Sequence, residues 1–155
     1  MKSFTSNIII KTTATKLWEA LTSKELSPQY WSDREIRSEW VVGSQVSLVQ
    51  KDGKVNWQGN VLSFEPFTSL SFTFDVSVDP RVHGINSEHA RFLADEPISK
   101  VTFNLKPFGG AMMLTIIHED LSDALEAVAS MSWVYVTSSL KSLLETGEPL
   151  AKVVV

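Results

Sequence analysis

Apolar and polar residues alternate with a period of two along much of the chain, which is the pattern of strands that bury one face. The longest alternating run covers 69–78, and its apolar face consists of Leu70, Phe72, Phe74, Val76 and Val78. Shorter runs predict further strands at 4–11, 36–40, 45–50, 56–64, 100–106 and 112–119. Because the opposite faces are polar, these strands are expected to form an antiparallel sheet that is covered on one side.

Three segments have helical spacing instead. Residues 14–22 are apolar at helical intervals and follow Thr13, a preferred N-cap residue, and a second short helix is expected over 24–29. Near the end of the chain an apolar stripe recurs at helical spacing: Trp133, Val136, Leu140, Leu143 and Leu144. This long helix is predicted to begin at Asp123, which has capping-box spacing with Glu126, and to end at Gly147.

The order of these elements predicts an α+β fold. A one-sided sheet and one long helix with an apolar stripe bury their apolar faces most simply when the sheet curls around the helix. The length of 155 residues is typical of one domain, so residues 1–155 are expected to form a single unit. The segment 79–97 breaks the periodicity and is predicted to be a long, mobile connection.

Composition narrows the classes of function. The chain has no cysteine, which excludes disulfides, thiolate metal sites and cysteine nucleophiles. Its net charge is −4 and its Lys and Arg residues are scattered, so no nucleic-acid partner is expected. No apolar stretch approaches the roughly 20 residues that span a bilayer, and no signal-peptide core is found. These features predict a cytoplasmic protein that does not insert into a membrane.

Several blocks of the sequence resemble a known family. They are Ile10, Leu17-Trp18-Glu19-Ala20-Leu21-Thr22, Trp31, Trp40-Val41-Val42-Gly43, Trp57-Gln58-Gly59-Asn60-Val61, Trp133 and Leu140-Lys141-Ser142-Leu143-Leu144-Glu145-Thr146-Gly147. Together they resemble the activator of Hsp90 ATPase homologue (AHSA1-like) branch of the START-like (SRPBCC) superfamily, over nearly the whole chain. The resemblance implies a helix-grip fold, in which a curved antiparallel sheet wraps around the long C-terminal helix and leaves an apolar cavity between them.

Large apolar side chains on the inward faces are the candidate lining of that cavity, because concave apolar spaces take ligands. The predicted lining residues are Trp57, Phe72, Phe74, Phe103, Met112, Met131 and Trp133. Arg81, His83 and Arg91 of the long connection are expected at the cavity mouth as polar anchors. His118 and the other histidines lack metal-ligand spacing and no serine lies in a nucleophile elbow, so no metal, cofactor or catalytic residue is predicted.

The resemblance does not carry one activity with it, because superfamily relatives bind lipids, hormones or polyketides, some catalyse cyclisation, and the eukaryotic namesake domain acts on a chaperone. The favoured hypothesis is non-enzymatic binding of a small apolar or amphipathic molecule between the sheet and the C-terminal helix. The alternative is a protein–protein adaptor, including a chaperone cofactor, which an exposed apolar patch would support. A cyclase or hydratase is favoured least, because the inward strand faces are apolar. The oligomeric state is left open.

Overall fold

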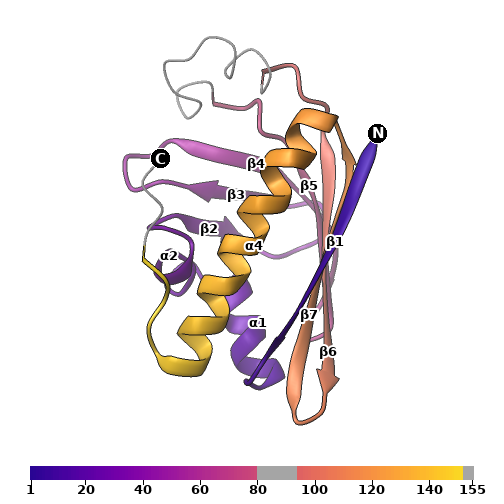
Figure 1. Ribbon diagram of the computed structural model, residues 1–155. Coiled ribbons are helices and arrows are strands. Elements are labelled where there is room, and N and C mark those ends of the chain that lie inside the picture. Colours follow the sequence, from indigo (N-terminus) through magenta and orange to yellow (C-terminus); the bar gives the residue numbers. More distant parts are fainter. Residues whose placement is uncertain (80–93, 152–155) are drawn as a thin grey trace.

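The computed structural model describes residues 1–79 and 94–151, which form a curved antiparallel sheet gripping one long helix (Figure 1). The seven strands lie in the order β1-β7-β6-β5-β4-β3-β2. Their bounds are β1 (Lys2–Ile10), β2 (Glu35–Ser38), β3 (Gln45–Val49), β4 (Val55–Glu65), β5 (Ser69–Phe74), β6 (Ser99–Phe108) and β7 (Ala111–Leu121). The helix α4 (Asp123–Thr146) crosses the concave face of the sheet. The α+β helix-grip fold predicted from the sequence is therefore confirmed.

Two short helices follow the first strand, as predicted. In α1 (Ala14–Thr22) the N-cap is Thr13, whose Oγ1 accepts a hydrogen bond from the Lys16 backbone N–H at 3.2 Å. The second helix, α2 (Ser27–Tyr30), is shorter than the predicted 24–29 and has Pro28 in its first turn. Proline has no backbone N–H, but the first N–H groups of a helix have no partner within the helix, so a proline is well tolerated at this position. Helix α2 packs against α4.

Helix α4 begins at Asp123, as predicted, but the residue that caps it differs from the one that the capping-box spacing indicated. Its N-cap is Ser122 and not Asp123, because the Ser122 hydroxyl accepts the Leu125 backbone N–H at 3.1 Å. The carboxylate of Glu96 accepts both the backbone N–H of Ser122, at 3.2 Å, and its hydroxyl. In a capping box, the side chain of the third helical residue accepts the backbone N–H of the N-cap residue. Here Glu96, which lies before β6 and is distant in sequence, performs this role. This buried carboxylate also interacts favourably with the helix dipole.

Strand β5 ends earlier than its alternating pattern predicts. The sequence predicts a strand to 78, whereas β5 ends at Phe74. Asp75 Oδ1 accepts hydrogen bonds from both the backbone N–H and the hydroxyl of Ser77, at 2.9 and 2.6 Å. Such an aspartate turn competes with sheet pairing. The chain therefore leaves the sheet here despite its continued alternation.

Glycine allows the tight curvature of the sheet at the middle of β4. A Cβ atom on Gly59 would lie 1.7 Å from the backbone oxygen of Thr73 in β5. The next residue, Asn60, donates its backbone N–H to Thr73 Oγ1 at 2.8 Å. Only glycine permits this approach of the two backbones. A side chain at position 59 would therefore force β4 and β5 apart.

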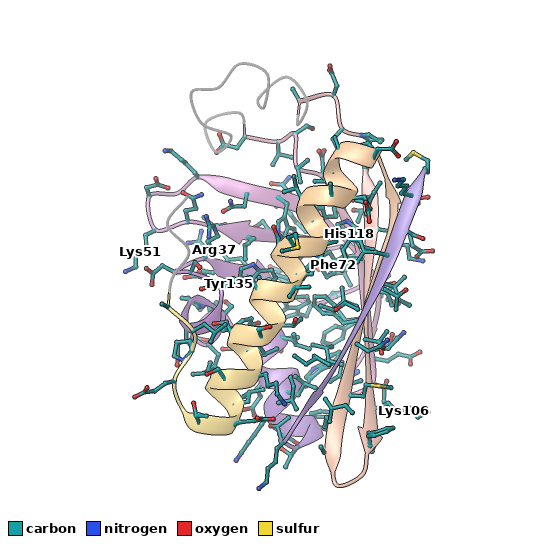
Figure 2. All side chains as sticks on the ribbon, in the orientation of Figure 1. Arg37, Lys51, Phe72, Lys106, His118 and Tyr135 are labelled. Atoms are coloured by element: carbon teal, nitrogen blue, oxygen red, sulfur yellow. The ribbon has the colours of Figure 1, made fainter. Side chains whose placement is uncertain are left out.

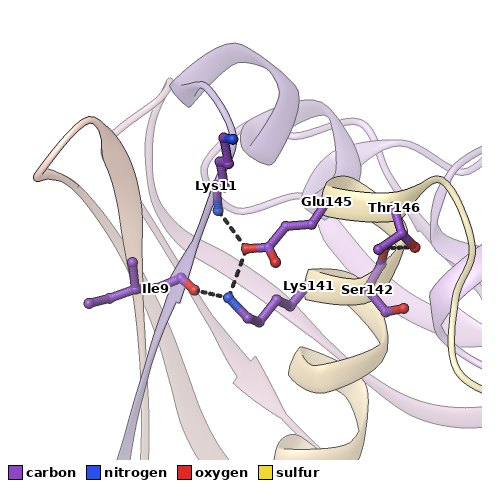
Figure 3. Close-up of polar contacts among 6 residues, drawn as sticks. All are labelled: Ile9, Lys11, Lys141, Ser142, Glu145 and Thr146. Carbon is purple, nitrogen blue, oxygen red and sulfur yellow. Dashed lines mark hydrogen bonds and ion pairs between the residues drawn. The ribbon is translucent and has the colours of Figure 1, made fainter.

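The C-terminal end of α4 is fastened to the end of β1 by a small polar cluster (Figure 3). Lys141 donates from Nζ to the Ile9 carbonyl oxygen at 2.6 Å and to Glu145 Oε2 at 2.7 Å. The Lys11 backbone N–H donates to the same Glu145 oxygen at 2.8 Å. The hydrogen bond from Lys11, followed by that from Lys141, lowers the pKa of Glu145. These contacts fix the angle at which α4 crosses the sheet.

The described residues also bear on the membrane prediction. Within residues 1–79 and 94–151, no helix has the length and apolar character needed to cross a bilayer.

Candidate functional site

Five of the predicted lining residues lie together between the sheet and α4, where Figure 2 shows Phe72 beside the helix. They are Trp57, Phe72, Phe74, Phe103 and Trp133, and all are buried. The ring of Trp57 stacks on Phe72 with centroids 5.1 Å apart, and Phe72 meets Phe103 edge-on at 5.6 Å. Phe103 in turn meets Trp133 of α4 at 5.7 Å. The rings therefore form one contact chain from the sheet to the helix, which we call the aromatic cluster.

The remaining predicted residues do not join the aromatic cluster. Met112 is buried, but it lies near the β6–β7 turn, opposite Pro107. Met131 is 69% exposed on the outer side of α4, so its predicted place in the lining is corrected. Met131 is two positions from Trp133 in the sequence, and two positions correspond to a rotation of about 200° around a helix. The two side chains therefore cannot both face inward. Arg81, His83 and Arg91 lie outside the described residues.

Trp31 is the main component that the sequence analysis did not place in the site. It follows α2 and is 7% exposed. Its ring centroid lies 6.2 Å from that of Trp57 on the sheet and 5.7 Å from that of Trp133 on α4. A residue from a connecting segment therefore fills the space between the sheet and the helix. We refer to Trp31, Trp57 and Trp133 as the tryptophan trio.

His118 of β7 lies fully buried at the edge of the aromatic cluster, beside α4 (Figure 2). Its Nδ1 accepts a hydrogen bond from Nε1–H of Trp133 at 3.1 Å. Its Nε2 lies 2.9 Å from the Ser99 hydroxyl, which donates to the carbonyl oxygen of Phe74 at 3.1 Å. The inward position of His118 was visible in the sequence, because it is in phase with the buried Leu114 and Ile116. Its partners were not, because they come from other elements.

These hydrogen bonds determine the proton positions on His118. An indole nitrogen only donates, so Nδ1 must be an acceptor and the neutral ring carries its proton on Nε2. That proton points to Ser99, whose own hydroxyl proton points to Phe74. Burial lowers the pKa of His118 from 6.5 to about 4. Ser99 and His118 therefore lack the geometry of a nucleophile–base pair, because the nitrogen facing the serine is a donor.

A second group of rings lies apart from the aromatic cluster, next to α1. Trp18 contacts Phe64 and Phe67 at centroid distances of 5.3 and 6.2 Å, and Trp40 stacks on Phe64 at 5.9 Å. The indole N–H of Trp40 donates to the Thr22 carbonyl oxygen at 2.9 Å. Trp18 is buried and belongs to the core. This group provides matched controls for variants in the aromatic cluster.

Hollows large enough for a small molecule lie on the surface. One of about 570 Å³ is bordered by α1 and β2, and another of about 460 Å³ lies over β3, β4 and β5. Neither is lined by a member of the aromatic cluster. Within the described part of the chain, no group of three acidic or histidine side chains could hold a metal ion.

Several solved structures share this fold. Protein MLL2253 from Mesorhizobium loti has a TM-score of 0.73 and 23% identity, covering 92% of this chain and 96% of that one. The Aha1 dimer from Colwellia psychrerythraea has a TM-score of 0.70 and 20% identity, covering 95% and 98%. DynU16, described as a protein in the dynemicin biosynthetic locus, has a TM-score of 0.74 and 18% identity, covering 96% of this chain and 49% of that one. At such identities the likeness shows the fold.

Comparison of sequences defines the family. No curated protein matches the sequence. The model of the family described as Activator of Hsp90 ATPase homolog 1-like protein matches residues 11–145, which is most of the chain. The chain therefore belongs to the family of Activator of Hsp90 ATPase homolog 1-like proteins.

Proposed function

We propose that the protein binds a small apolar or amphipathic molecule in the aromatic cluster, where the ligand takes the place of the Trp31 ring. The observation that carries the proposal is the position of Trp31 between Trp57 and Trp133. Trp31 belongs to a connection and not to the sheet or α4. Its ring can therefore swing out without breaking the main hydrogen-bonded elements, and an apolar ligand restores the buried ring contacts that are lost.

Two further observations support a ligand at this position. The space is bordered by aromatic side chains with few polar groups, which is typical of ligand sites in proteins. One structural neighbour, DynU16, is described as a protein of a biosynthetic locus, which fits a small-molecule ligand without naming it. Catalysis is not part of the proposal, because the buried His118 donates toward the Ser99 hydroxyl and cannot act as its base.

A ligand screen tests the proposal directly. Fatty acids, sterols, flavonoids and polyketide-like aromatics are added to the wild-type protein, and unfolding is followed by heat and denaturant. A binder should stabilise the fold by about 2.7 kcal/mol at a hundredfold excess over its dissociation constant. Phe72→Trp should abolish this shift by overfilling the aromatic cluster. Phe64→Trp, the same change in the second ring group, should leave it intact.

Two outcomes of the screen would contradict the proposal. If no member of these four classes shifts the midpoint, or if both variants retain the shift equally, the aromatic cluster is simply a packed core. Circular dichroism of each variant is the control for folding.

The outer face of α4 favours a second candidate function, which is protein binding. Val128, Met131 and Val134 are 46, 69 and 50% exposed, and 127–140 contains no charged residue. An exposed apolar helix face of this kind is typical of interaction surfaces. The Colwellia relative is described as a dimer, so a second copy of this chain is one partner to test. A chaperone is the other, because the family is named for an activator of Hsp90 ATPase.

Sedimentation analysis tests the second candidate. If α4 mediates pairing, the wild-type protein should sediment as a dimer at micromolar concentration and Met131→Lys should sediment as a monomer. If pairing is absent, stimulation of an Hsp90 ATPase that Met131→Lys abolishes would support a chaperone partner. A monomer that leaves the ATPase unchanged excludes both partners.

A further inference from the structure

A polar residue lies within three positions of each member of the tryptophan trio in the sequence. Arg34 follows Trp31, Asn56 precedes Trp57, and Tyr135 follows Trp133. Arg34 Nε donates to Asn56 Oδ1 at 3.1 Å. Two polar residues from a connection and from β4, which neighbour Trp31 and Trp57 in the sequence, therefore meet in the structure.

The backbone at this edge is held in unusual conformations. Ser32 and Asp33 both have positive φ values, of 51° and 64°, although neither is glycine. The Arg34 backbone N–H closes this turn by donating to the Trp31 carbonyl oxygen at 3.0 Å. Consecutive left-handed residues are strained, and strain of this kind concentrates at functional sites. The turn fixes Arg34 relative to Trp31.

A bulge in β4 presents the partner of Arg34. In the pairing of β3 with β4, Leu48 lies opposite Trp57 and Val49 lies opposite Val55, which leaves Asn56 as an extra residue. Bulges re-aim a side chain relative to regular alternation. The Asn56 amide is thereby free to orient the Arg34 guanidinium through Nε.

Within the described residues, Nε is the part of the Arg34 guanidinium that has a hydrogen-bond partner. Among residues 1–79 and 94–151, the two Nη groups of Arg34 form no hydrogen bond and no carboxylate forms an ion pair with it. The side chain is half-buried, and desolvation lowers the pKa of Arg34 against the opposing effects of Asp33 and Tyr135. Arg37, by contrast, pairs with Glu35 at 2.7 Å and its side chain is 55% exposed.

We propose that Arg34 anchors the carboxylate of an amphipathic ligand whose apolar body lies in the tryptophan trio. This inference rests on the proposed function above and names the class of its ligand. The Nη groups form the free end of a planar fork that matches a carboxylate, and a partly desolvated fork binds it more strongly than one in water. Asn56 acts as a positioning residue, because it orients the guanidinium.

A matched pair of probes tests the anchor. Naphthalene-2-carboxylate and naphthalene-2-carboxamide have the same shape, and only the first is charged at pH 7.5. Titration calorimetry of the wild-type protein should give about tenfold tighter binding of the carboxylate, as a charge-assisted hydrogen bond predicts. Arg34→Gln should reduce carboxylate affinity to that of the amide while the amide affinity changes less than about twofold. Arg37→Gln should change neither affinity.

The outcomes separate the anchor from the proposed function. If both probes bind wild type equally, or if Arg34→Gln still prefers the carboxylate, the anchor is wrong. Binding of the probes would still support the ligand site. If neither probe binds wild type although the ligand screen gives a binder, the anchor is rejected alone, and if the screen also gives no binder, the anchor and the ligand site are both rejected. If Arg34→Gln does not fold, the carboxylate preference of Arg34→Lys tests the anchor instead. This variant should retain a reduced preference for the carboxylate, because an ammonium keeps the charge and loses the fork, and an unreduced preference would overturn the anchor.

Discussion

The indole N–H of Trp133 donates a hydrogen bond to Nδ1 of His118 across 3.1 Å, and this contact joins α4 to the sheet inside the core. This hydrogen bond sets the tautomer of His118, because an N–H donor on Trp133 requires Nδ1 to be an acceptor without a proton. Protonation of Nδ1 would place two donors face to face. The folded state therefore holds His118 neutral, and the consequences are measurable.

The stability of the fold should fall in acid because of His118. Its folded pKa, about 4, lies below the 6.5 of the free side chain. Above pH 6.5 the histidine is neutral in both states and contributes no pH dependence. As the pH falls from about 6.5 to 4 the unfolded state takes up the proton first, so stability declines by about 3 kcal/mol.

Urea unfolding at pH 7, 5.5 and 4.5 measures this decline. His118→Gln removes the titrating group, so its unfolding free energy should depend less steeply on pH over that interval. Equal slopes for the variant and the wild type would show that His118 titrates normally in the folded protein.

Trp133→Phe should destabilise the protein and raise the pKa of His118. The substitution leaves Nδ1 buried without a donor, which costs about 1–3 kcal/mol in addition to the lost contacts. It also removes the group that opposes protonation of Nδ1. Histidine NMR titration gives the pKa, and denaturant unfolding gives the stability. The control is Trp40→Phe, which removes the hydrogen bond to Thr22 and should leave the His118 pKa unchanged.

Glu96→Ala should weaken the start of α4. It removes the acceptor for the backbone N–H and hydroxyl of Ser122, and loss of a helix cap costs about 1–2 kcal/mol. Asp123→Asn is the matched control, because the Asp123 side chain is 86% exposed and its ion pair with Lys2 is long, at 3.8 Å. Hydrogen exchange at the Leu125 amide should accelerate in the first variant alone. Unchanged exchange in Glu96→Ala would mean that the carboxylate is dispensable.

Periodicity carried most of the fold prediction. The alternation around Phe72 and the stripe through Trp133 and Leu140 identified the sheet, the helix and the faces that meet. The same reasoning failed where a side chain controls the chain direction. The end of β5 depends on an Asp75 turn, and the N-cap of α4 depends on Glu96, which is distant in sequence.

The site was predicted only where its residues belong to periodic elements. Trp31 was not predicted to belong to the site because it follows a helix of only four residues. The turn after it contains Ser32 and Asp33 in left-handed conformations, and without a glycine there the sequence gives no signal of this turn. The Arg34–Asn56 contact depends on a bulge, and bulges leave no periodic signal. The prediction for Met131 was wrong because this residue lies two positions before Trp133 on α4 and therefore faces solvent.

Removal of the Trp31 ring should destabilise the fold and tighten ligand binding. Trp31→Ala should cost about 3–5 kcal/mol, as for other buried aromatic residues. The ligand would then no longer compete with the ring, so the apparent dissociation constant should decrease about tenfold. Calorimetry with a binder from the ligand screen measures this change. Trp40→Ala is the control from the second ring group, and equal affinities in wild type and Trp31→Ala would exclude displacement of the ring.

The position of the bound ligand tests the central claim most directly. Nuclear Overhauser contacts are measured between a binder from the ligand screen and the indole protons of the wild-type protein. The account predicts contacts with Trp57 and Trp133, none with Trp18 or Trp40, and a changed chemical shift for Trp31. Contacts confined to Trp18 and Trp40, or to the exposed Met131 face of α4, would contradict it.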